Sequence, residues 1–100
     1  MKSKRSKATD ISKSVKENVW ERDGHKCIFC GSRYAMPNVH VIPRSKGGLG
    51  IEKNIVTGCL NCHFKMDNSP EREKYIEKAN NYLDSIYGER NIDELIYKKF

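Results

Sequence analysis

Cys59-Leu60-Asn61-Cys62-His63 decides the fold of this chain, because together with Cys27-Ile28-Phe29-Cys30 it forms two C-x-x-C pairs. Each pair turns tightly enough to present two sulfur atoms to one tetrahedral ion, so this spacing predicts a structural zinc site built from Cys27, Cys30, Cys59 and Cys62. Two disulfides in a small secreted domain, or unrelated buried thiols, are the alternatives. Residues 31–58 separate the pairs and are numerous enough to carry a function besides metal binding.

The N-terminus favours zinc over disulfides. Residues 1–16 are rich in Lys and Ser and lack the apolar core of a signal peptide, and no window of the chain is apolar enough to cross a membrane. We therefore expect a cytoplasmic protein with reduced thiols and no membrane partner. A chain of 100 residues with 37% hydrophobic content predicts one domain with a modest core. Zinc should accordingly be required for folding.

The formal net charge of +6 is concentrated at one end of the chain. Residues 1–16 hold six basic side chains against Asp10, which gives +5 and leaves +1 for residues 17–100. Such a segment is either a solvated arm or one that seeks the phosphates of nucleic acid. We predict a basic flexible tail over residues 1–12. Its candidate DNA contacts are Lys2, Lys4, Arg5 and Lys7.

Hydrophobic periodicity and breaker residues predict a small α+β fold. The expected elements are two short strands at residues 37–43 and 54–57 and four helices at residues 12–23, 60–67, 71–87 and 93–100. Ser69-Pro70 should cap the third helix and supply its first residue. The aromatic stripe of that amphipathic helix, part of a C-terminal helical extension over residues 70–100, should pack in the core.

Three segments in one order resemble the HNH endonuclease family, and small free-standing members of that family occur in phages and prophages. The segments are VWERDGHKCIFCG (19–31), VHVIPRSKGG (39–48) and KNIVTGCLNCHFK (53–65). The resemblance covers roughly residues 19–67. It implies a ββα-metal fold, in which a two-stranded hairpin and a helix hold one catalytic metal, within a single domain spanning residues 13–100.

The resemblance implies three catalytic roles. His40 matches the general base that activates the attacking water, and an imidazole suits that task because its unperturbed pKa of about 6.5 leaves it largely neutral near pH 7. Asn54 matches the asparagine that fixes the loop holding this histidine. His63 matches the metal ligand on the helix. Asp67 lies four residues further along, so on a helix it shares a face with His63 and could share its ion.

One position departs from the family pattern. Many relatives carry a metal-binding histidine or aspartate immediately before the general base, where this chain has Val39. A carboxylate at Asp67 favours a hard ion, so we expect catalytic Mg²⁺ or Mn²⁺, with Ni²⁺ as a possible substitute in vitro. Asn38 is a further residue to consider near the metal. Arg44 and Lys46, just past the strand, are candidate phosphate contacts.

The implied function is metal-dependent hydrolysis of DNA phosphodiester bonds, by nicking or double-strand cleavage, with 5′-phosphate and 3′-hydroxyl products. DNA is the implied partner, the chain is expected to act as a monomer or weak dimer, and analogy with phage relatives adds a terminase as a second partner. The alternative from another class is a noncatalytic, zinc-stabilised module that binds DNA or a partner protein. Val39 keeps this alternative open.

Overall fold

The computed structural model describes residues 3–98, in which four α-helices and one two-stranded sheet follow the order α1–α2–β1–β2–α3–α4. The helices are α1 (Lys4–Thr9), α2 (Lys13–Arg22), α3 (Leu60–Asn68) and α4 (Arg72–Tyr87). The strands are β1 (Ala35–His40) and β2 (Ile55–Cys59), and two 3-10 helices, η1 (Arg44–Lys46) and η2 (Ile92–Glu94), complete the list. The predicted α+β class is confirmed. Within residues 3–98, no helix combines the length and apolar character of a membrane-spanning segment.

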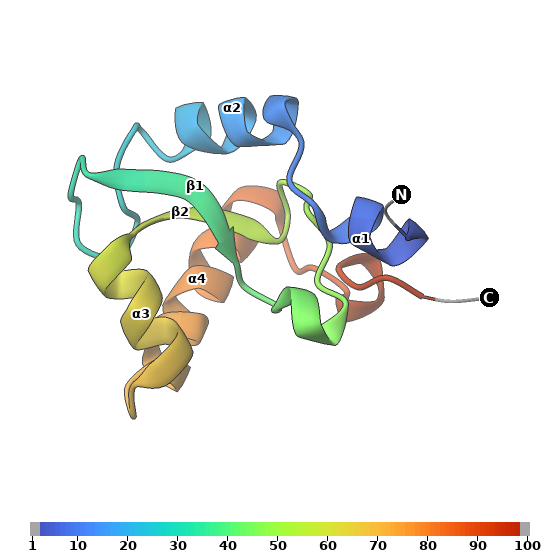
Figure 1. Ribbon diagram of the computed structural model, residues 1–100. Coiled ribbons are helices and arrows are strands. Elements are labelled where there is room, and N and C mark those ends of the chain that lie inside the picture. Colours follow the sequence, from blue (N-terminus) through green and yellow to red (C-terminus); the bar gives the residue numbers. More distant parts are fainter. Residues whose placement is uncertain (1–2, 99–100) are drawn as a thin grey trace.

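The two strands are antiparallel and lie between helices. Figure 1 shows α2 along one side of the hairpin and α3 and α4 on the other. Val39 pairs with Val56, both fully buried, and the register shifts between Met36 and Val39. The first strand was predicted to extend to residue 43 but ends at His40. The reason is that the Asn54 side chain, not β2, accepts the hydrogen bond from the Ile42 backbone N–H.

The hydrophobic core joins the sheet to the C-terminal helices. Its buried members are Val39, Val41, Val56, Met66, Ala79 and Leu83. Tyr75, Ile76, Tyr82 and Tyr87 of α4 pack against them, so the prediction that the aromatic stripe is core packing is confirmed. The predicted cap of α4 is wrong. Glu71 is the N-cap, while the Ser69 hydroxyl donates to the Lys65 carbonyl of α3 and accepts from the Glu71 N–H.

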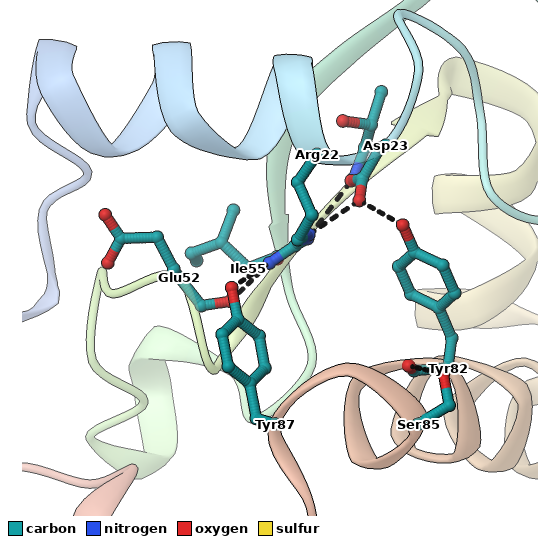
Figure 2. Close-up of polar contacts among 8 residues, drawn as sticks. Arg22, Asp23, Glu52, Ile55, Tyr82, Ser85 and Tyr87 are labelled. Atoms are coloured by element: carbon teal, nitrogen blue, oxygen red, sulfur yellow. Dashed lines mark hydrogen bonds and ion pairs between the residues drawn. The ribbon is translucent and has the colours of Figure 1, made fainter.

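A polar network crosses this core at the end of α2 (Figure 2). The Arg22 guanidinium donates to the buried Asp23 carboxylate at 2.7 and 3.1 Å and to the Ile55 carbonyl at 2.7 Å. Asp23 also accepts from the Tyr82 hydroxyl at 2.6 Å and from the Thr57 N–H at 2.8 Å. Because its members come from α2, β2 and α4, the network fixes the hairpin between the helices that cover it.

Residues 3–12, predicted as part of a flexible tail, instead form α1 and a packed linker. Basic composition alone predicts solvation, but the backbone of this segment finds partners in the loop after β1. The Gly50 N–H donates to the Ala8 carbonyl at 3.0 Å, and a Cβ at Gly50 would lie 2.0 Å from the Asp10 carbonyl oxygen. Thr9 is buried. The segment is therefore a wall of the domain, beside the loop that carries η1 (Figure 1).

The C-terminal segment also differs from its predicted form. A helix was expected over residues 93–100, of which 99 and 100 lie outside the described residues. The structure has η2 followed by an isolated bridge between Gly48 and Ile96. Leu95 is buried and its carbonyl accepts from the Leu49 N–H at 2.8 Å. Pairing with the loop between β1 and β2 therefore replaces further helix formation.

Candidate metal centre and catalytic pocket

The four cysteines converge at one end of the hairpin. Cys27 and Cys30 lie on the turn before β1, Cys59 ends β2 and Cys62 lies in the first turn of α3. Their four sulfur atoms lie within 4.8 Å of one another, and all four cysteines are free. In a tetrahedral zinc site with Zn–S bonds of about 2.3 Å the sulfur atoms are about 3.8 Å apart. The cluster therefore fits a metal ion such as zinc.

The thiols of the cluster differ in acidity. Burial would raise the pKa of Cys27, but hydrogen bonds from the backbone at Cys59, Cys30 and Phe29 outweigh it and lower that pKa to about 7. Burial and the neighbouring cysteines raise the pKa of Cys62. A metal-free cluster thus holds one thiol that ionises readily beside another that resists ionisation. A bound divalent cation would favour the deprotonated form of all four thiols, since a coordinated thiol is deprotonated.

A second set of polar residues lines an open pocket of about 620 Å³ beside the sheet. It includes three of the predicted catalytic and metal-binding residues, His40 of β1 and His63 and Asp67 of α3. The other residues that line it are Asp10, Ile11, Lys16, Asn38, Pro43 and Arg44. Chain segments far apart in sequence thus bring two imidazoles, two carboxylates and two cationic side chains to one concave surface.

His40 is held with one ring nitrogen engaged. Its Nε2 lies 2.8 Å from the Thr9 carbonyl oxygen, and because a carbonyl only accepts, Nε2 carries the proton and Nδ1 carries the lone pair. Burial lowers the pKa of His40, and the charges of Arg44 and His63 act in the same direction against the Thr9 carbonyl and Asp10. A neutral imidazole with an available acceptor nitrogen is what a general base requires.

Asn54 is fully buried at the base of the loop that follows His40. Its Oδ1 accepts from the Ile42 N–H at 2.9 Å, and its Nδ2 donates to the carbonyls of Ile42 and Leu49 at 3.2 and 2.9 Å. Its own carbonyl accepts from the Val41 N–H. Asn54 therefore lies where it can fix the loop beside His40, and its side chain is not among those that line the pocket.

His63 and Asp67 form the pair expected from their spacing. The Nε2 atom of His63 lies 3.2 Å from the Asp67 carboxylate, one helical turn further along α3. Val39 is fully buried in the core, whereas its neighbour Asn38 lines the pocket. The position before His40 therefore faces away from the pocket, and a metal ligand there would need a different strand register.

The predicted phosphate contacts fall into two groups. Arg44 lines the pocket and pairs with Asp10. Lys46, Lys4 and Arg5 instead line a second pocket with Ser3, Gly47 and Tyr97. Arg5 is engaged there, since its guanidinium donates to the Ser45 carbonyl at 2.8 Å.

Two further predicted contacts come from the same basic segment. Lys7 is exposed on α1, and Lys2 lies outside the described residues. Sequence reasoning missed Thr9, whose carbonyl contacts His40, and the pocket residues Asp10 and Lys16. No motif marks a backbone carbonyl or a side chain that reaches the pocket from a separate segment.

Comparison of the chain with family models, with curated proteins and with solved structures finds no match. The likeness to HNH endonucleases consequently rests on the three sequence segments quoted above.

Proposed function

We propose that the protein is a metal-dependent HNH-type endonuclease that hydrolyses DNA phosphodiester bonds. The observation that carries this proposal is the pocket, where His40 meets His63 and Asp67 at one open surface. The pocket also carries the cationic side chains of Lys16 and Arg44 on its wall. These two charges suit a phosphodiester, which is anionic, and the openness of the pocket suits a polymer that must pass through it.

His40 acts as the general base in this proposal. Its Nδ1 takes a proton from the water that attacks the phosphorus atom. The Thr9 carbonyl holds the ring through Nε2–H during the transfer, so the proton arrives at a defined atom. The same carbonyl and the nearby Asp10 favour the imidazolium that results, which limits the cost of accepting the proton.

His63 and Asp67 are the proposed ligands of a catalytic divalent ion. Two protein donors suffice for Mg²⁺, which is commonly held by one or two carboxylates together with waters and substrate phosphate. When bound, such an ion stabilises negative charge on the phosphorane-like transition state and on the leaving 3′ oxygen. An ion held in this way needs no ligand from the position of Val39. The cysteine cluster would hold zinc and serve structure alone.

The test is cleavage of supercoiled plasmid by zinc-loaded protein with Mg²⁺, Mn²⁺ or Ni²⁺. We expect nicked or linear product, and we expect His40→Ala to lower the rate about 100-fold or more, the usual contribution of a general base. His25→Ala is the matched control, since His25 lies outside the pocket and its Nε2 contacts Glu21 on α2. Asp67→Asn should raise the concentration of divalent ion needed for half-maximal cleavage.

Two results would contradict the proposal. Cleavage by His40→Ala at the parent rate would remove His40 from the mechanism. Retention of plasmid binding with no cleavage in any ion would favour the noncatalytic DNA-binding module, and Val39 would then mark a site that does not bind a catalytic metal.

A further inference from the structure

An apolar groove of about 430 Å³ lies next to the candidate pocket. Three large side chains on its wall are unusually exposed: Tyr34 at 93%, Met36 at 59% and Leu60 at 86%. Phe64, one helical turn after Leu60 on α3, is 63% exposed. Isolated exposed apolar residues need no explanation, but several gathered in one place mark a binding surface.

The groove is continuous with the proposed phosphate site. Asn38 and His63 line both hollows, so a ligand that occupies the pocket reaches the groove past these two side chains. The walls of the groove are also anchored. Tyr34 and Met36 follow the first cysteine pair, and Leu60 follows Cys59 directly, so the metal centre fixes the backbone from which these side chains project.

The chemistry of the groove suits a flat heterocycle attached to a phosphate. An aromatic ring, a thioether and an aliphatic side chain provide surfaces against which a nucleobase can stack, while Arg33 adds one positive charge at the wall. Within a duplex both faces of a base are covered by its neighbours. Only a base that has left the stack can therefore offer its face to the groove.

We propose that this groove binds an unstacked nucleobase of the strand whose phosphate lies in the pocket. The inference rests on the proposed function and narrows its substrate class. Preferred substrates carry single-stranded or frayed bases beside the scissile bond, and intact duplex is cleaved more slowly because a base must first be unstacked.

The experiment measures binding, so that it does not depend on cleavage. The probes are a single-stranded oligonucleotide carrying 2-aminopurine and its fully paired duplex, titrated with zinc-loaded His40→Ala protein. We expect Tyr34→Ser combined with Leu60→Ser to weaken binding of the single strand about tenfold, the scale of one lost stacking contact, while duplex binding changes little. Ile92→Ser is the matched control, since Ile92 is 62% exposed on η2 and does not line the groove.

Two outcomes would overturn the inference. If the double variant binds the single strand with unchanged affinity, the groove does not bind a nucleobase and would instead suit a protein partner. If the affinities for single strand and duplex fall equally, the groove contacts the DNA backbone and not an unstacked base. Zinc content and far-UV circular dichroism establish that the variants are folded. Failure of the proposed function can be distinguished from failure of this inference. If the double variant selectively loses single-strand binding while the parent protein cleaves no DNA, the groove is still a base-binding site and only the proposed catalysis is wrong.

Discussion

His40 shows how one side chain of the pocket is prepared for its proposed chemistry. The ring is half-buried, and the pKa is below the ordinary value of 6.5 chiefly because burial penalises the charged form. Since the base must be neutral to accept a proton, activity should rise with pH through this lowered pKa and then level off. When kcat is measured at saturating DNA over a series of pH values, the midpoint of its acid limb should therefore lie below pH 6.5.

Substitution of Arg44 tests whether nearby charges help to set the pKa of His40. Its positive charge helps to lower the pKa of His40, so Arg44→Gln should raise that pKa and move the acid limb of kcat to higher pH. Asp10→Asn removes a charge that raises the same pKa, so it should move the limb to lower pH. Arg72→Gln, on an exposed turn of α4, should leave the limb in place. A shift of the Arg44→Gln limb to lower pH would contradict this account.

At this scale the sequence predicts the residues but not their surroundings. The resemblance to HNH endonucleases selects His40, Asn54 and His63, and helical spacing adds Asp67. The structure brings His40, His63 and Asp67 to one pocket, with Asn54 at the base of the loop that follows His40. Nothing in the spacing indicates that the Thr9 carbonyl binds His40. That contact depends on how α1 docks, and backbone groups leave no trace in a residue pattern.

The elements of the hairpin are positioned by α2 and α4 through the buried Asp23 carboxylate. Asp23→Ala would leave the Arg22 guanidinium without its carboxylate partner and the Thr57 N–H without its acceptor, so we expect the free energy of unfolding to fall by about 3–5 kcal/mol. Burial raises the pKa of Tyr82 to about 12, which keeps its hydroxyl protonated as a donor. Tyr82→Phe removes one hydrogen bond to a charged group and should cost about 1.5–3 kcal/mol. Urea denaturation measures both, and a Tyr82→Phe loss equal to that of Asp23→Ala would argue against this ranking.

The contact between the α1 segment and the loop that joins β1 to β2 can be tested at Gly50. An added methyl group would lie 2.0 Å from the Asp10 carbonyl oxygen, so Gly50→Ala must displace residues 9–11 and loosen the bond between Thr9 and His40. We expect the proposed nuclease activity to drop at least tenfold. Gly88→Ala at the end of α4 is the control, because its Cβ would meet nothing within 4 Å although its φ of +80° makes that substitution mildly destabilising. Equal activity in both variants would show that the packing of residues 3–12 does not hold His40 in position.

Sequence patterns predict some elements better than others. Helices α2 and α3 were predicted to within one residue at each end. The structure adds their caps, the side chains of Ser12 and Cys59, which were not predicted. Residues 41–43 were predicted to extend the strand because their side chains favour it, but the Asn54 side chain takes the Ile42 N–H that the strand would need. Composition also hides α1, since its lysines indicate solvation while its backbone packs against the loop.

At the scale of the whole molecule, the cysteine cluster joins the turn before β1 to the end of β2 and the start of α3. Purified protein should contain one zinc ion per chain by mass spectrometry of metals. Removing that ion, or substituting Cys62→Ser, should abolish cooperative unfolding and much of the helical circular dichroism. Undiminished helical signal and a sharp thermal transition in metal-free protein would show that the core alone maintains the fold.

Cys62 and His63 are consecutive residues in the first turn of α3, so two ions of different purpose would share one short helix. This adjacency gives chelator experiments two time courses. A weakly held magnesium ion should leave within the mixing time, and activity should return at once when magnesium is restored. Zinc leaves a closed thiolate site slowly, and the resulting inactivation should persist until zinc is supplied and the chain refolds. Inhibition by EDTA must therefore be followed over time before it is assigned to the catalytic ion.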